Sequence, residues 1–131
     1  MSENADPDRS STIEKLVIVI VGPCASGKST LAANLRAVGL DARVSGQEHS
    51  EVSYLWSRME PDVVVGLHID LETLRFRRGS TWSARLFDHQ LRRLREAYGA
   101  AHLHLDTSTL DESQALAEVL ALVGHSLTEP D

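Results

Sequence analysis

The sequence holds a single cysteine among its 131 residues, so no disulfide can form within the chain. Its longest uninterrupted apolar run, Leu16 to Val21, has six residues, whereas a helix that crosses a bilayer needs about 20. Basic residues are also scarce: 13 Lys and Arg stand against 19 Asp and Glu, a net charge of -6. A general nucleic-acid binder is usually basic. We therefore expect a cytoplasmic protein with no membrane span and no nucleic-acid partner, which acts on a small molecule.

The length predicts one domain with a tail at each end. Residues 1–14 are polar and show no apolar period, so we expect a disordered tail there, a folded domain over 15–126 and a second tail over 127–131. The apolar runs LVIVIV and VVVGLHI are typical of strands buried on both faces of a parallel sheet. Apolar spacing and turn residues predict strands over 16–21, 41–45, 63–69 and 101–106, and helices over 28–38, 52–59, 71–78, 87–98 and 112–123.

This alternation predicts an α/β fold: a single domain of three layers, α/β/α, around a mainly parallel sheet of four or five strands. The strand 16–21 is expected at the centre of the sheet, and the alternating segment 101–106 at an edge. Thr109 and Glu112 have the spacing of a capping box, so we expect the last helix to begin there and to bury Leu120 with its apolar face before Gly124.

One motif carries most of the chemistry. Residues 22–29, GPCASGKS, match the pattern G-x-x-x-x-G-K-[ST] between a buried strand and a helix, which is the context that the Walker A motif, or P-loop, requires. Gly22 and Gly27 permit a backbone whose N–H groups point at phosphate oxygens. The helix N-terminus adds partial positive charge at the same place. Lys28 can reach the terminal phosphates, and the Ser29 hydroxyl can bind Mg²⁺.

With this motif the chain resembles the P-loop NTPases, and among them the small-metabolite and nucleoside monophosphate kinases such as shikimate kinase and thymidylate kinase. VVVGLHIDLETLRFRRG is similar to the strand and arginine-bearing lid of those kinases, and HLHLDTSTLDESQALAEVLALV to their last strand, adenine-side loop and closing helix. The resemblance implies ATP and Mg²⁺ as cofactors, a small-molecule acceptor, and lid arginines at Arg75, Arg77 and Arg78. The nucleotide-binding residues that it implies are Gly22, Cys24, Ala25, Ser26, Gly27, Lys28, Ser29, Thr30, Thr107 and Ser108.

The chain departs from those kinases between Gly39 and Pro61, where the segment is too short for their acceptor-binding helices, and where no strand ends in the usual carboxylate. Two residues are candidates for this carboxylate, as a ligand of the metal or its water, or as a base. Glu48 follows the strand 41–45, and Asp70 follows the strand 63–69. We prefer Glu48; Asp70 is equally suited to cap the helix that follows it.

Three readings of function remain open. The first is an ATP-dependent kinase of reduced size, in which Lys28, the lid arginines and a carboxylate position and neutralise the transferring phosphoryl group. The second is a nucleotide-binding or regulatory module with a degenerate or partner-completed active site, which the short middle segment favours. The third is a nucleoside-triphosphate hydrolase. Seven of the 13 basic residues lie between positions 75 and 95, either as a phosphate-handling segment or as solvated helix faces.

Overall fold

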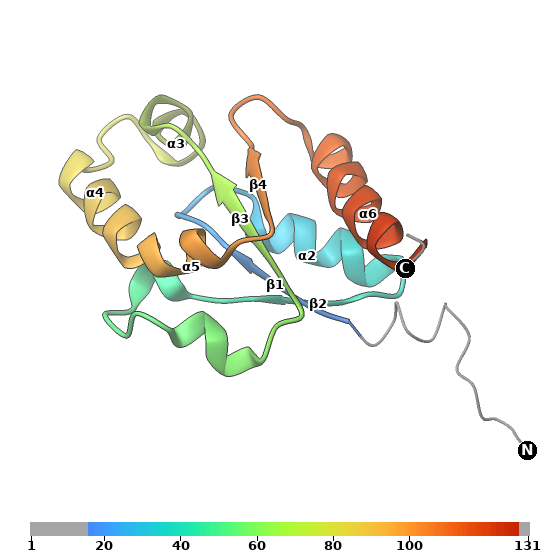
Figure 1. Cartoon of the computed structure of the whole chain (residues 1–131). Coiled ribbons are helices and arrows are strands. Elements are labelled where there is room, and N and C mark those ends of the chain that lie inside the picture. Colours follow the sequence, from blue (N-terminus) through green and yellow to red (C-terminus); the bar gives the residue numbers. More distant parts are fainter. Residues whose placement is uncertain (1–15, 129–131) are drawn as a thin grey trace, which may run out of the picture.

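The computed structural model describes residues 16–128, with side chains as far as Gly124 (Figure 1). The predicted tail 1–14 lies outside the described residues, as do residues 129–131 of the second predicted tail. Residues 127 and 128 are helical, so the last helix extends beyond the boundary expected at 126. No helix in the described part of the chain combines the length and the apolar character that crossing a membrane requires.

Four strands form one parallel sheet: β1 (Val17–Val21), β2 (Asp41–Val44), β3 (Val63–His68) and β4 (Leu103–Asp106). Their order is β2-β1-β3-β4, which confirms that β1 is central and that β4 is an edge strand. Val19 pairs with Arg43 on one side and with Val64 on the other. Because the strands are parallel, all four carboxyl ends meet at one edge of the sheet, where ligands of open α/β sheets bind.

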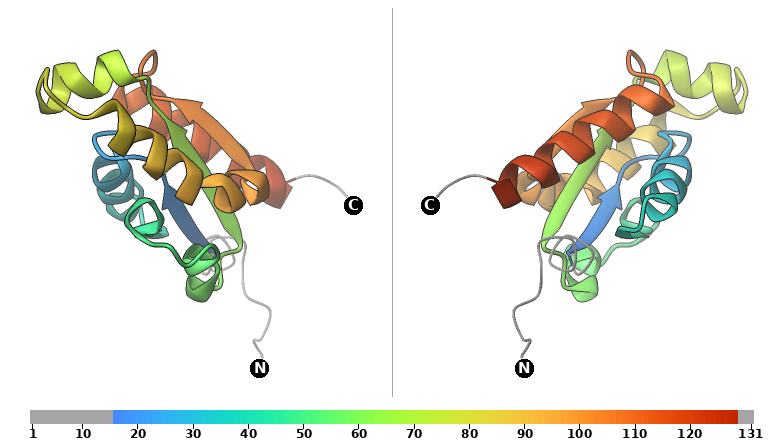
Figure 2. Two further views of the ribbon diagram at one scale, coloured as in Figure 1. Left: turned by 90° about the vertical axis from the view of Figure 1, so that its left-hand side faces the viewer. Right: turned by 90° about the vertical axis from the view of Figure 1, so that its right-hand side faces the viewer.

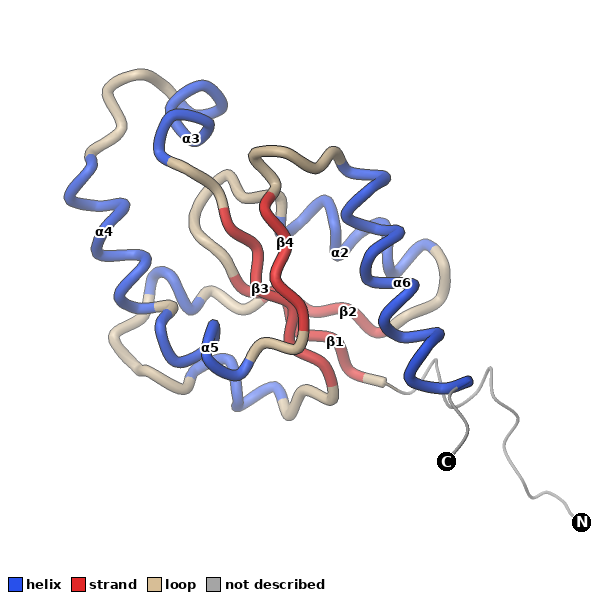
Figure 3. The backbone as a smooth tube through the Cα atoms, turned by 45° about the horizontal axis from the view of Figure 1, so that its top comes forward, coloured by secondary structure: helices blue, strands red, loops and turns tan. Residues whose placement is uncertain are grey.

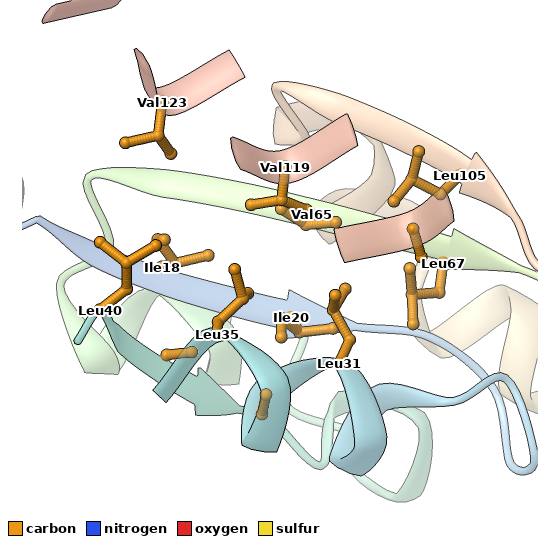
Figure 4. Close-up of a cluster of buried hydrophobic side chains, with 13 residues drawn as sticks. Ile18, Ile20, Leu31, Leu35, Leu40, Val65, Leu67, Leu105, Val119 and Val123 are labelled. Carbon is orange, nitrogen blue, oxygen red and sulfur yellow. The ribbon is translucent and has the colours of Figure 1, made fainter. Parts of the chain in front are cut away.

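Two helices, α2 (Lys28–Ala37) and α6 (Glu112–Thr128), cover one face of this sheet. Ile18 and Ile20 of β1 point toward them, and Leu35 and Val119 are fully buried against these strand residues (Figure 4). Alternate residues of a strand point to opposite faces, so Val19 and Val21 belong to the second face. The continuous apolar run of β1 is therefore explained by burial on both sides.

The second face is covered by α4 (Ala84–Arg93) and α5 (Arg95–Ala100), with Leu94 and Ala97 fully buried against it. Figures 2 and 3 show the sheet between these two layers of helices. A shorter helix, α3 (Leu71–Arg78), follows the carboxyl end of β3. The predicted three-layer α/β/α fold with a four-stranded parallel sheet is confirmed, and the described residues contain no fifth strand.

The α-helix predicted over 52–59 is wrong. The segment between β2 and β3 instead contains two short 3-10 helices, Gln47–His49 and Leu55–Met59. The fully buried side-chain amide of Gln47 donates to the carbonyl of Val52 and accepts from the N–H of Trp56. In an α-helix this N–H and this carbonyl would pair with each other, so the Gln47 amide replaces the helical hydrogen bond.

Two helix ends also differ from the prediction. The helix expected over 87–98 begins earlier, at a Ser83 cap, and is interrupted at Leu94, which separates α4 from α5. The capping box of α6 is formed by Asp111 and Gln114, which exchange backbone and side-chain hydrogen bonds, and not by Thr109 and Glu112. This helix continues through Gly124, and Leu120 on it is 37% exposed.

Candidate functional site

The loop Gly22–Gly27, here called the glycine-rich loop, connects β1 to α2 at the carboxyl edge of the sheet. Ala25 and Gly27 have φ angles of 65° and 96°, so left-handed residues alternate with others along the loop. Such alternation turns successive N–H groups to the same side, where an anion can bind them. Gly22 is required for a different reason: a Cβ there would lie 2.6 Å from Ser26 Oγ and 3.0 Å from the Leu67 carbonyl oxygen.

The start of α2 differs from that of α3, α4 and α6. Asp70 and Ser83 accept hydrogen bonds from backbone N–H groups and cap α3 and α4, and Asp111 does the same for α6. At α2 the capping position is Gly27, which has no side chain to offer. The first N–H groups of a helix have no partner within it. Those of α2 are therefore available, with the positive end of the helix dipole, to a ligand.

These N–H groups face a cavity of about 850 Å³, a size typical of small-molecule sites. Residues of the glycine-rich loop and the start of α2 form one wall. The end of α3, the loop after β4 and the start of α6 form the rest. The lining residues are Ala25, Ser26, Gly27, Lys28, Ser29, Thr30, Leu31, Leu67, Arg77, Arg78, Thr107, Leu110, Asp111, Glu112, Ser113 and Ala115.

Lys28 lies between this cavity and a buried carboxylate. Its Nζ donates to the carbonyl of Pro23 at 2.9 Å and lies 2.9 Å from Glu48 Oε2. Glu48 itself is 4% exposed, and its second oxygen, Oε1, has no hydrogen-bond partner among the described residues. Glu48, which the sequence favoured over Asp70 as the carboxylate of the site, therefore lies beside the lysine of the motif.

Arg77 and Thr107 connect the glycine-rich loop to the opposite wall. Arg77 donates from its two terminal nitrogens to the carbonyls of Ala25 and Thr107, each at 2.7 Å. The Thr107 hydroxyl donates to the Ser26 carbonyl, also at 2.7 Å. Two long-range contacts thus fix the backbone of the loop, one from α3 and one from the loop after β4, and Arg77 places its guanidinium at the cavity wall.

Not all of the predicted site residues reach the cavity. Asp70 caps α3, where hydrogen bonds from Thr73 hold the pKa of its carboxyl below the usual value. Ser108 accepts a hydrogen bond from the Asp70 N–H and does not line the cavity. Arg75 donates to the Trp82 carbonyl in the loop between α3 and α4. Of the predicted arginines, Arg77 and Arg78 lie at the cavity and Arg75 supports the turn beside them.

The other side of the glycine-rich loop is covered by α4, which the sequence reasoning did not include in the site. Gln90 is 1% exposed; its side chain accepts from the Cys24 N–H and donates to Cys24 Sγ. Arg93 donates to the Glu48 carbonyl and to the Glu51 carboxylate. One sequence signal was available: Gln90 is a polar residue directly beside the apolar position Leu91 in an amphipathic helix.

No protein-family profile matches the chain, and no curated protein matches it in sequence. A solved structure with a similar fold is that of the YorR protein from Bacillus subtilis. It aligns over 88% of this chain and 99% of its own length, with a TM-score of 0.60 and 16% identity. That crystal structure was determined in complex with phosphorylated GDP. At this identity the likeness establishes the shared α/β fold.

Proposed function

We propose that this protein binds a nucleoside triphosphate with Mg²⁺ in the 850 Å³ cavity and transfers its γ-phosphoryl group to a small-molecule hydroxyl or phosphate. One observation carries the proposal: the uncapped N-terminus of α2 and the left-handed turns of the P-loop direct N–H groups into a cavity whose lysine is paired with a buried carboxylate. Phosphoryl transfer needs mainly such positioning and charge neutralisation.

The residues divide into distinct roles. The N–H groups of Ala25 and of residues 27–30 bind the phosphates, and Lys28 neutralises charge on the terminal one. Arg77 and Arg78 line the same cavity at the end of α3, where their positive charge would stabilise the bound phosphates. The P-loop hydroxyl of Ser29 and the carboxylate of Glu48 are the groups that would hold Mg²⁺, directly or through water. The unpartnered Oε1 of Glu48 fits this role, because a cation would satisfy a buried oxygen that otherwise lacks a partner.

Magnesium bound there would neutralise charge on the phosphate oxygens.

Two further features concern the nucleobase of the triphosphate. Thr107 borders the cavity on the side where the resemblance places the adenine. The YorR structure contains a guanine nucleotide, so ATP and GTP both belong in the test. ATP remains the nucleotide that we propose.

A second candidate is a nucleotide-binding module without chemistry of its own. The observation that favours it is the cover on the Cys24 side of the P-loop, where Gln90 contacts Cys24 and Arg93 donates to the backbone carbonyl of Glu48. An acceptor that approached Lys28 from this side would first have to displace α4. In this reading the triphosphate binds in the cavity, and no acceptor reaches it.

The test combines binding with turnover. Ligand that binds only the folded state stabilises it by RT ln(1 + [L]/Kd), about 2.7 kcal/mol at a hundredfold excess over Kd. We expect ATP with Mg²⁺ to raise the thermal midpoint, and a panel of hydroxyl and phosphate acceptors to reveal one that accelerates ADP release. Binding without any acceptor-dependent turnover would support the module. No binding of either ATP or GTP would overturn both candidates.

A further inference from the structure

A group of three potential metal ligands lies on the α4 side of the glycine-rich loop, outside the residues that line the cavity. Cys24 comes from the loop itself, and Glu48 and His49 come from the 3-10 helix after β2. One ligand atom from each of the three side chains lies within 4.8 Å of the other two. Cys24 Sγ is 3.8 Å from His49 Nε2, and His49 Nε2 is 3.4 Å from Glu48 Oε2.

These separations match those of a tetrahedral zinc site. Zinc binds sulfur at about 2.3 Å and nitrogen or oxygen at about 2.0–2.2 Å, so two ligands at the tetrahedral angle lie about 3.4–3.6 Å apart. The His49–Glu48 separation already has this value, and the Cys24–His49 separation exceeds it by a few tenths of an ångström. A small rotation of the exposed His49 ring is enough to close this difference, since its side chain is 62% exposed.

Glu48 supplies an independent reason to expect a cation. Lys28 contacts only Oε2, whereas Oε1 is buried and has no hydrogen-bond partner among the residues described. A buried carboxylate oxygen without a partner is costly. A cation bound by both oxygens of this carboxylate would satisfy Oε1, while Oε2 remains 3.4 Å from His49 Nε2.

We propose that Cys24, Glu48 and His49 bind one Zn²⁺ ion, with water in the fourth position. The donor set selects the metal: a thiolate and an imidazole favour zinc, whereas magnesium prefers oxygen ligands only. Three protein ligands with one open position are the pattern of zinc sites that remain accessible to solvent. Gln90 fixes the sulfur by donating to Cys24 Sγ at 3.2 Å, as partners of metal ligands commonly do.

This site does not depend on the proposed function, although the two share Glu48. Zinc at this position and Mg²⁺ beside a bound triphosphate would compete for the same carboxylate. The test therefore uses the metal alone, without nucleotide. A failure to bind zinc then leaves nucleotide binding untouched, and a failure to bind nucleotide leaves the zinc measurement valid.

The experiment titrates the full, reduced, metal-free chain with Zn²⁺ in a calorimeter, and with Co²⁺ in a spectrophotometer. We expect one ion per chain and a thiolate-to-cobalt charge-transfer band. Cys24→Ser and His49→Gln should each weaken zinc binding at least about tenfold. The loss of a residue that only hydrogen-bonds to a metal ligand already weakens binding about 10–100-fold, so the loss of a ligand should cost no less. Cys24→Ser should also abolish the charge-transfer band.

His89→Gln is the matched control, because His89 is an exposed histidine of α4 outside the group. It should bind zinc like the unchanged chain. Because the His49 ring is exposed, His49→Gln should fold normally, and it still tests the proposal if Cys24→Ser fails to fold. Zinc binding that is unchanged in His49→Gln would overturn the proposal, as would binding that is weakened as much in His89→Gln as in His49→Gln, or a cobalt complex without a sulfur band.

Discussion

The ammonium of Lys28 and the carboxylate of Glu48 form an ion pair with a separation of 2.9 Å, and their side chains are only 10% and 5% exposed. The pair joins the helix that begins at the glycine-rich loop to the 3-10 helix after β2. Each charge is desolvated and each depends on the other for compensation. Replacing one partner therefore affects the stability of the fold as well as ligand binding.

Lys28→Ala should lose most of the affinity for triphosphate and, in addition, about 3 kcal/mol of unfolding free energy, because it leaves the Glu48 charge buried and unpaired. Lys28→Ala combined with Glu48→Gln removes this stranded charge. The double variant should recover most of the stability in urea unfolding and none of the affinity in calorimetry. Equal stability of the single variant and the unchanged chain would contradict the buried pair.

Arg77→Ala should weaken triphosphate binding about tenfold, because a hydrogen bond from a charged group contributes about 1.5 kcal/mol and Arg77 holds the loop through Ala25 and Thr107. Arg85→Ala, an exposed residue of α4, is the control and should leave the affinity unchanged. Calorimetric titration with ATP and Mg²⁺ measures both. The same loss in the two variants would indicate a general effect of positive charge.

Gly22→Ala should destabilise the fold by about 2 kcal/mol, the usual scale of overpacking, because its Cβ would meet the backbone carbonyl of Leu67 at 3.0 Å. Gly46→Ala is the matched control. It has nothing within 4 Å of the added Cβ, and its φ of -85° suits any residue. Thermal midpoints of the two variants decide the question, and a fall of equal size in both would refute the steric argument.

The histidine pair at the end of β3 predicts a pH dependence. His68 Nε2 lies 2.8 Å from His104 Nδ1, and burial, followed by the charge of His104, lowers the pKa of His68 below its usual 6.5. The unfolded chain therefore takes up a proton that the folded chain resists. The stability that neutral His68 contributes is complete above about pH 6.5 and is lost as the pH falls toward its lower folded pKa.

We expect the urea midpoint to decrease from about pH 7.5 to about pH 5.5, and His68→Phe to decrease less over this interval. His89→Gln, which changes an exposed histidine, should follow the unchanged chain. A pH dependence that is identical in His68→Phe would assign the effect to other groups.

The strands, the extent to which each is buried, and the glycine-rich loop could be predicted from the sequence because their signals are local. The apolar run Val17–Val21 predicts that β1 is buried, and the motif directly after it predicts the turn into α2. The resemblance to known kinases added the arginine-bearing α3, of which Arg77 and Arg78 reach the cavity.

The predictions from the sequence failed where a side chain contacts a residue far away in the sequence, or where it replaces a backbone hydrogen bond. The apolar stripe from Val52 to Met59 has helical spacing, and only the Gln47 amide, inserted between Val52 and Trp56, shows why no α-helix forms. Gln90 meets Cys24 across 66 positions, a relationship that periodicity cannot reveal. The contribution of α4 to the site was missed for this reason.

The order of the four strands also bears on aggregation. A parallel sheet with two edges offers unpaired backbone groups on its outer strands, to which a strand of another chain can add. β2 carries Asp41 and Arg43, joined by an ion pair, and β4 carries His104 and Asp106, both exposed. A strand that extended the sheet at either edge would have to desolvate these groups, so the sheet resists further growth at both ends.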